Sequence, residues 1–304
     1  MTALKQKVLV IGGPTASGKS GLALSAALKY GGVIINADSM QLYDGLGILT
    51  AQPSAADRAA APHVLYGTLA PADICSAARF SRLALAEIDA AINAGKLPIV
   101  VGGTGFYLKA LLKGLSPIPS VPDDIRQHLI KRQQEIGTAA LYAEFAAQDP
   151  VMAAKIDRDN PQRIVRAYEV LLATGKSLAE WQALPPEPPP PHLDFILATL
   201  LPPRAVLYAQ CDARFGQMLA AGALEEVREF GKTATPDMPL VKALGYPELA
   251  SHLAGNITLT DAVTLAQNAT RQYAKRQVTW FRHQLVADIV LEKPDVSGLA
   301  ARLS

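Results

Sequence analysis

Short, wholly apolar runs alternate with amphipathic stretches in the first part of the chain. The runs are Val8–Ile11, Val33–Ile35 and Ile99–Val101, and none of them contains a polar residue. This pattern is typical of parallel strands that are buried on both faces. Apolar residues at helical spacing follow in 21–30 and 76–93, and glycines come soon after each stretch. The alternation predicts an α/β fold with a doubly wound parallel sheet.

The pattern changes after Gly114. Three prolines between 117 and 122 mark one boundary, and a proline-rich run at 185–191 marks another. Because proline fits neither a helix interior nor an inner strand, we expect the second run to be a stiff surface linker. The periodic stretches between these boundaries predict only helices, over 123–136, 138–148, 160–174 and 177–181. The sequence therefore predicts an all-helical insertion at 116–191 between two parts of one core, 1–115 and 192–304.

Further elements complete the predicted core. The region 42–73 has scattered Gly, Pro and Ser residues, and we expect it to be a substrate-facing loop with short elements. A helix is expected over 106–113. A last core strand is expected over 195–201, followed by one helix over 204–230.

A phosphate-binding loop follows the first predicted strand. Gly13, Gly18, Lys19 and Ser20 match the pattern G-x-x-x-x-G-K-[ST], between a strand and a helix. Glycines let backbone N–H groups point inward, the lysine adds a cation, and the serine hydroxyl can bind Mg²⁺. The alternative is a turn that merely connects strand and helix. The loop predicts a P-loop core that binds a di- or triphosphate through residues Gly13, Pro14, Thr15, Ala16, Ser17, Gly18, Lys19 and Ser20.

Polar and glycine residues stand at the ends of the other two strands. Asp38 follows the second strand, and the run Gly102–Gly105 follows the third. Ligands gather at the carboxyl ends of parallel strands, so both segments should lie beside the phosphate loop. Asp38 could be a Mg²⁺ partner, a general base or a helix cap. The glycine run indicates either a tight turn or a place where a ligand approaches the backbone closely.

Composition narrows the class of protein. The 304 residues are 50% hydrophobic, which is enough for a large core, and no apolar run approaches the length of a membrane span. We therefore expect a cytoplasmic enzyme without a membrane partner. The net charge of +2 says nothing of nucleic acid, because a basic footprint is local. Cys75 and Cys211 are too far apart for a metal site or a disulfide framework, so we expect ordinary small apolar residues.

The chain resembles the bacterial tRNA dimethylallyltransferases. The matching strings are GPTASGKS, INADSMQLYDGL, GKLPIVVGGTGFYLKALL, DNPQRIVRAYEVLLATGKSLAEW and RQYAKRQVTWFRHQ, and they occur in family order along nearly the whole chain. The strings at 38–41 and 271–277 are not shared with ordinary kinases. The resemblance implies transfer of a dimethylallyl group from dimethylallyl diphosphate to N6 of adenosine 37 beside the anticodon, with Mg²⁺ and release of pyrophosphate.

The resemblance also implies roles for individual residues. Lys19 and Arg214 would stabilise the leaving diphosphate, Ser20 would bind the metal, and Asp38 would be the general base. Thr104 and the turn at 38–41 would hold the adenosine. The insertion would bind the anticodon stem-loop, and the family expectation is a monomer. The residues expected to contact tRNA are Asp38, Ser39, Met40, Gln41, Thr104, Arg126, Gln162, Arg163, Ile164, Val165 and Arg166.

Some positions depart from the family pattern. The family continues its DSMQ string with Gly-x-Asp-Ile-Gly-Thr-Ala-Lys-Pro, whereas this chain has Gly47, Leu49 and Gln52 in place of the Asp, the second Gly and the Lys. An Arg of a later string is Gln210 here. Two other functions stay open on the residues alone: prenylation of free adenine nucleotides, which the presence of the insertion disfavours, and phosphoryl transfer by a P-loop kinase.

Overall fold

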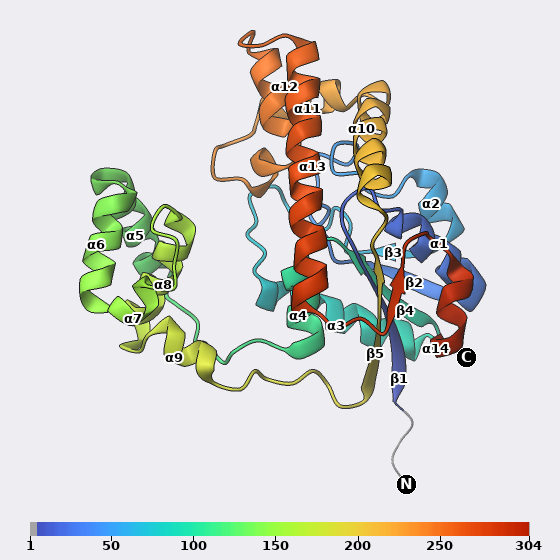
Figure 1. The fold of residues 1–304 in the computed structure, drawn as a ribbon, viewed down its shortest axis with the longest axis horizontal. Helices are drawn as coiled ribbons and strands as arrows, with labels where there is room; N and C mark the ends of the chain where they lie inside the picture. Colours follow the sequence, from blue (N-terminus) through green and yellow to red (C-terminus); the bar gives the residue numbers. More distant parts are fainter. Residues whose placement is uncertain (1–4, 304) are drawn as a thin grey trace. The chain divides into compact units, whose positions relative to one another are not determined.

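A computed structural model of the chain describes residues 5–303. Six parallel strands form one sheet in the order β3-β2-β4-β1-β5-β6 (Figure 1). In the register of the central strands, Val10 pairs with Val100 on one side and with Leu197 on the other. The strands are β1 Gln6–Gly12, β2 Gly32–Asn36, β3 His63–Val64, β4 Leu97–Gly102, β5 Leu193–Leu200 and β6 Ile289–Leu291.

Apolar side chains cover both faces of the sheet. Leu9 and Ile11 of β1 pack with Leu22 of helix α1 (Lys19–Tyr30) in one cluster. Val8 and Val10 point to the other face, where a second cluster includes residues of α3 (Ala77–Asn93), α4 (Gly105–Lys113) and α13 (Leu259–Gln284). Alternate residues of one strand thus face two helical layers, and the doubly wound α/β fold is confirmed.

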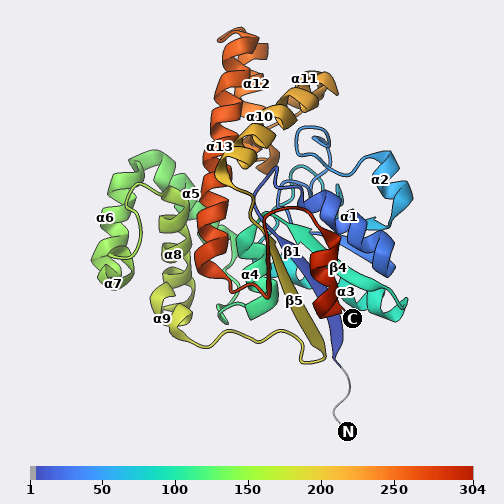
Figure 2. The ribbon, with the colours of Figure 1, turned by 45° about the vertical axis from the view of Figure 1, so that its right-hand side comes forward.

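The chain divides into two compact units. The first runs up to Leu112 and resumes at Pro189, and the second is Lys113–Pro188. The second unit is all helical (Figure 2). It has its own apolar core around Phe145 and Ile164. The proline-based boundaries, 116 and 191, lie a few residues later. The helices of the second unit are α5 Asp123–Ile136, α6 Thr138–Gln148, α7 Pro150–Ala153, α8 Pro161–Thr174 and α9 Leu178–Ala183.

Two expectations for the second part of the core are wrong. The single helix expected over 204–230 is two helices, α10 Arg204–Ala220 and α11 Ala223–Gly231. Gly222 between them has a φ of 102°, a left-handed conformation that ends a helix. The strand β5 is not the last one, because β6 adds an edge of three residues after α13. The remaining elements are α2 Ala55–Ala60, α12 Tyr246–Leu253, α14 Ala300–Leu303 and two short 3-10 helices, Pro239–Lys242 and Val296–Leu299.

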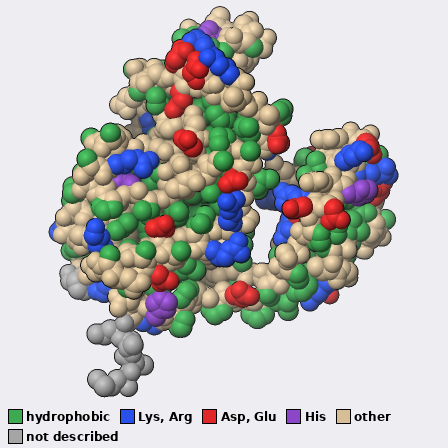
Figure 3. Space-filling view, turned by 180° about the vertical axis from the view of Figure 1, so that it is seen from behind, with side chains coloured by type: hydrophobic (Ala, Val, Ile, Leu, Met, Phe, Trp, Pro, Cys, Tyr) green, Lys and Arg blue, Asp and Glu red, His purple; other side chains and the backbone are tan. Residues whose placement is uncertain are grey.

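None of the helices within residues 5–303 has the length and hydrophobicity needed to cross a lipid bilayer. Basic and acidic side chains are interspersed on the face of the molecule in Figure 3. Near the end of α13, Phe281 is buried and Trp280 packs against the apolar cluster to which Phe281 belongs.

Candidate active site

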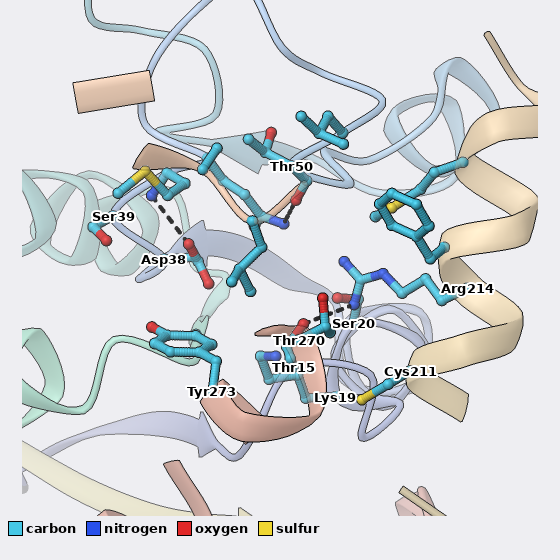
Figure 4. A pocket seen from close by; sticks show the side chains of 18 of the residues that line it. Thr15, Lys19, Ser20, Asp38, Ser39, Thr50, Cys211, Arg214, Thr270 and Tyr273 are labelled. Carbon is cyan, nitrogen blue, oxygen red and sulfur yellow. Dashed lines mark hydrogen bonds between the residues drawn. The ribbon is translucent and has the colours of Figure 1, made fainter. Parts of the chain in front are cut away.

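A cavity of about 300 Å³ lies at the carboxyl ends of the central strands. Its wall combines the phosphate loop, the segment after β2, and side chains of α10 and α13 (Figure 4). Lys19, Ser20 and Asp38 therefore share one enclosed space, as the ends of parallel strands predict. The polar lining is completed by Thr15, Ser39, Gln41, Thr50, Arg214, Lys242, Thr270, Tyr273 and Arg276.

The phosphate loop connects β1 to α1 in a compact turn. Gly18 has a φ of 90° and Ala16 a φ of 60°, so the backbone passes twice through the left-handed region. The N–H of Ser17 donates to the carbonyl of Pro14 at 3.3 Å. The Ser17 hydroxyl is buried and has no hydrogen-bond partner among the described residues. Such a buried donor is costly unless a ligand satisfies it.

Two cations of the cavity wall, Lys19 and Arg214, lie beside the phosphate loop. The Lys19 Nζ donates to the carbonyl of Pro14 at 3.1 Å. Burial lowers the pKa of Lys19 to about 8, an effect that the Asp38 carboxylate opposes and the Arg214 guanidinium reinforces. Arg214 comes from α10, donates to the Thr15 hydroxyl at 3.4 Å, and also has its pKa lowered by burial. The cavity is therefore electropositive beside the loop, which suits a polyanionic ligand.

The Asp38 carboxylate is positioned by a buried asparagine. The Oδ1 of Asn36 accepts from the N–H of Asp38 at 2.8 Å, and its Nδ2 donates to the carbonyls of Asp38 and Leu65 at 3.0 and 2.9 Å. Asp38 Oδ1 accepts from the N–H of Met40 at 3.1 Å. No helix begins here, since the next one is α2 at Ala55, so the helix-cap alternative for Asp38 is wrong.

Thr104 holds Ser39, in the segment that follows β2, through hydrogen bonds. Its Oγ1 accepts from the N–H of Ser39 at 2.9 Å and donates to the Ser39 hydroxyl at 3.2 Å. Thr104 itself is absent from the cavity wall, although Ser39, Met40 and Gln41 line it. The Gln41 amide donates to the carbonyls of Thr50 and Ala51, both at 2.8 Å, so it holds the following loop.

Several lining residues escape prediction from the sequence. Thr270, Tyr273 and Arg276 come from α13, and burial raises the pKa of Tyr273 to about 12. Their helical spacing places them on one side of α13, and this periodicity is the signal that could have found them. The apolar part of the wall includes Leu49, Val101, Phe215, Met218, Ala243 and Leu244, together with Cys211.

A family model for IPP transferases matches residues 41–284. The chain is 54% identical over 281 residues to a tRNA dimethylallyltransferase of Rhodospirillum centenum, covering 92% of this chain and 90% of that protein. It is 51% identical over 304 residues to the tRNA dimethylallyltransferase of Paramagnetospirillum magneticum, covering 100% and 96% of the two chains. This chain belongs to the IPP transferase family. The resemblance seen in the sequence motifs is thereby confirmed.

Solved structures of similar proteins match the fold of this IPP transferase along nearly its whole length. The tRNA isopentenylpyrophosphate transferase of Bacillus halodurans has a TM-score of 0.65 at 33% identity, covering 94% of this chain and 89% of that one. A eukaryotic dimethylallyltransferase acting on tRNA has a TM-score of 0.80 at 28% identity, covering 97% and 75%. The chain therefore shares its fold with these two enzymes.

The positions that depart from the family pattern have structural partners in this chain. The Gln52 amide donates to the carbonyl of Tyr43 at 2.8 Å. The N–H of Gln52 donates to the carbonyl of Gly47 at 2.8 Å, and Leu49 contributes its side chain to the cavity wall. Gln210 is exposed on α10. The loop is thus folded without the usual Lys of the family.

The expected tRNA contacts of the insertion lie on α5 and α8. Arg126, Gln162 and Arg163 are exposed. Ile164 is fully buried and Val165 is 8% exposed, so these two side chains belong to the core of the insertion and are not available for contact with RNA.

Arg166 is also exposed, but it already has a protein partner. Its guanidinium pairs with the buried Glu169 carboxylate at 2.6 Å. Arg166 therefore has a structural task besides any contact with RNA.

Proposed function

We propose that this IPP transferase moves a dimethylallyl group from dimethylallyl diphosphate to N6 of adenosine 37 of tRNA. One observation carries the proposal in a chain of this family: the phosphate loop with its two cations and the Asp38 carboxylate open into the same cavity of about 300 Å³. A donor with an anionic head and an acceptor that loses a proton therefore meet in one enclosed space.

The diphosphate occupies the electropositive end of the cavity. Lys19 and Arg214 line this end of the cavity. Negative charge grows on the pyrophosphate as its bond to the allylic carbon breaks. Fixed cations and donors aimed at that charge stabilise the transition state more than the ground state.

Magnesium fits the residues at this end. Within residues 5–303 no group of three or more His, Cys, Asp or Glu side chains could form a protein cage for a metal ion. Mg²⁺ characteristically needs only one or two protein ligands, together with waters and substrate phosphates, and the Ser20 hydroxyl lies in the cavity wall. When bound, the ion neutralises charge on the leaving group.

Asp38 acts on the acceptor. The adenine N6 attacks the allylic carbon, the carbon–oxygen bond to the diphosphate breaks, and pyrophosphate leaves. The N6 proton goes to the Asp38 carboxylate as general base. The segment Ser39–Gln41 contacts the nucleoside, and Thr104 positions this segment through Ser39.

The helical insertion binds the anticodon stem-loop. Arg126, Gln162 and Arg163 present polar groups outward from α5 and α8, and an RNA loop offers phosphates, 2′-hydroxyls and an unstacked base to such groups. We propose that a single copy of the chain suffices.

Incubating the purified protein with labelled dimethylallyl diphosphate and undermodified tRNA tests the proposal, with AMP and ATP as alternative acceptors. Label should enter tRNA at adenosine 37 with release of pyrophosphate. Label in AMP or ATP alone would point to a free-nucleotide prenyltransferase. Transfer of the γ-phosphate of ATP without prenyl transfer would contradict the proposal in favour of a kinase.

A further inference from the structure

A buried glutamine of α13 joins two loops of the active site. Gln277 is 6% exposed. Its Oε1 accepts from the backbone N–H of Thr15 in the phosphate loop at 2.8 Å. Its Nε2 donates to the carbonyl of Gly103, after β4, at 2.8 Å. Thr15 and Gly103 are far apart in sequence, and this one side chain bonds to both.

The two partners require a side chain that can both accept and donate, as an amide does. A backbone N–H only donates and a carbonyl only accepts, so the single side chain between them must accept at one atom and donate at the other. This pairing also fixes the orientation of the Gln277 amide. Both groups are shielded by α13, where a lost partner would leave an unsatisfied polar group.

Close packing against α13 leaves no room for a side chain at Gly103 or Gly105. A Cβ on Gly103 would lie 2.6 Å from the Gln277 Nε2, and one on Gly105 would lie 2.2 Å from the Trp280 ring. The helix thus rests directly on the glycine run. The same run holds the segment of the proposed base, since Thr104 donates through its N–H to the carbonyl of Ala37 at 3.4 Å and accepts from Ser39.

The bond to Thr15 also has a consequence for the donor. The N–H of Thr15 is committed to Gln277, so this residue offers the diphosphate its hydroxyl, which Arg214 contacts at 3.4 Å. Gln277 therefore sets the conformation of the donor loop on one side and of the acceptor segment on the other.

We propose that Gln277 is a positioning residue that fixes the distance between the diphosphate loop and the Asp38 segment. The proposal rests on the prenyl transfer proposed above. Misplacement of reacting groups by about 1 Å can cost on the order of 10² in rate. Loss of this bridge should therefore lower the rate of the chemical step more than the affinity for either substrate.

Two variants and one control test this role. Gln277→Met keeps the approximate shape and removes both hydrogen bonds, and it should lower the single-turnover rate with saturating substrates about 10²-fold. Gln267→Met is the control, because Gln267 donates from the same helix to the carbonyl of Asp212 at 3.2 Å, away from the cavity. The control should keep a rate within about twofold of wild type. Hydrogen exchange of the Thr15 amide should be slow in wild type and fast only in Gln277→Met.

Gln277→Glu adds a readout that a purely structural role would not move. A carboxylate repels the Gly103 carbonyl, whereas a protonated carboxyl can donate to it and still accept from Thr15. Burial raises the pKa of such a carboxyl. The rate of this variant relative to wild type should therefore rise at least about tenfold from pH 8.5 to pH 6. Lys19, Asp38, Arg214 and Tyr273 face the same region in both proteins, and the ratio removes their contribution.

The outcomes separate this inference from the proposed function. A Gln277→Met rate within twofold of wild type, or a pH-independent ratio for Gln277→Glu, would overturn the positioning role alone. If Gln277→Met does not fold, the pH ratio of Gln277→Glu decides. Failure of the wild-type protein to prenylate tRNA would overturn the proposed function, and the role of Gln277 in catalysis with it.

Discussion

At the scale of single residues, buried amides rather than charged groups hold the reacting groups in place. Asn36 bonds the backbone on both sides of the Asp38 peptide, and Gln277 bonds the two loops that flank it. Within residues 5–303, the Asp38 carboxylate accepts a hydrogen bond from the N–H of Met40. Its other oxygen faces the space where an acceptor would bind (Figure 4). The backbone around Asp38 is thus held in place while one carboxylate oxygen stays accessible, and this arrangement suits a general base.

Replacing Asp38 with Asn tests that role. Asn keeps an acceptor for the Met40 N–H but cannot take the N6 proton, so the single-turnover rate should fall by about 10²- to 10⁴-fold. Binding of donor and tRNA should change far less, as measured by calorimetry and filter binding. Asp44→Asn is the control, because the exposed Asp44 makes a similar local bond to the N–H of Gly45. A near-normal rate in Asp38→Asn would place the base elsewhere.

The lowered pKa of Lys19 predicts a pH dependence of donor use. Lys19 is protonated below its pKa of about 8, and only this form attracts the diphosphate. The value of kcat/KM for the donor should therefore fall as pH rises through about 8, by up to about tenfold per pH unit.

Substitutions of lysines check this assignment. Lys19→Ala should have a low kcat/KM that no longer declines across this pH range, while binding of tRNA stays nearly unchanged. Lys29→Ala, at the far end of the same helix, should keep the wild-type profile. An identical decline in Lys19→Ala would assign the titration to another group.

At the scale of elements, the first turns of α8 combine exposed and buried tasks. Arg163 is exposed next to Asn160, whose side chain accepts from the Arg163 N–H at 3.1 Å and caps the helix. Arg166, one turn later, neutralises a buried carboxylate of Glu169. The two arginines are adjacent on the helix. Loss of the Arg166 side chain would leave the buried Glu169 carboxylate without this partner, and loss of the exposed Arg163 side chain would not.

We expect Arg163→Ala to weaken tRNA binding and to reduce the slope of log K against log salt by about one unit, with little effect on stability. Arg166→Ala should in addition lower the free energy of unfolding by about 1–3 kcal/mol, because the Glu169 carboxylate loses its partner. Arg163→Lys retains the charge and should restore the slope. Unchanged slopes in both alanine variants, measured by filter binding from 50 to 200 mM salt, would show that these arginines do not contact phosphates.

The limits of prediction from the sequence are clearest for these elements. Apolar runs and helical periodicity predicted the central strands and four helices of the insertion, because each pattern depends on neighbours in the chain. The short helix α7, Pro150–Ala153, was not predicted. The edge strand β6 has only three residues, and Val290 in it is 63% exposed, so it carries no such pattern. The helix break at Gly222 depends on one backbone angle.

Site residues show the same limit. The phosphate loop was predicted from its G-x-x-x-x-G-K-[ST] pattern and Asp38 from its place at a strand end, and both line one cavity, as converging strand ends predict. Asn36 and Gln277 were missed, since their partners are backbone groups that only the folded chain brings near. The string at 162–166 could not show that Ile164 points inward, because a helix alternates exposed and buried positions within one motif.

At the scale of the whole molecule, each unit has its own core. We therefore expect the first unit to bind the donor without the insertion. Replacing residues 113–188 with a long Gly-Ser linker should leave donor binding within about threefold of the full chain, because every residue of the cavity wall lies in the first unit. Binding of tRNA should fall strongly, as measured by filter binding. Full tRNA affinity in the shortened protein, with a cooperative thermal transition as the folding control, would contradict a role of the insertion in RNA recognition.

The register of the sheet also determines when the active site can form during synthesis. The central strand β1 is made first, but Leu9 pairs with Ile99 on one side and with Ile196 on the other. Such distant partners delay folding, because a long loop of chain must close, with a loss of entropy, before these strands can pair. The apolar core of the insertion is formed by residues within Lys113–Pro188. On a translating ribosome the insertion should therefore fold first, and the phosphate loop should stay unable to bind its donor until α13 has emerged.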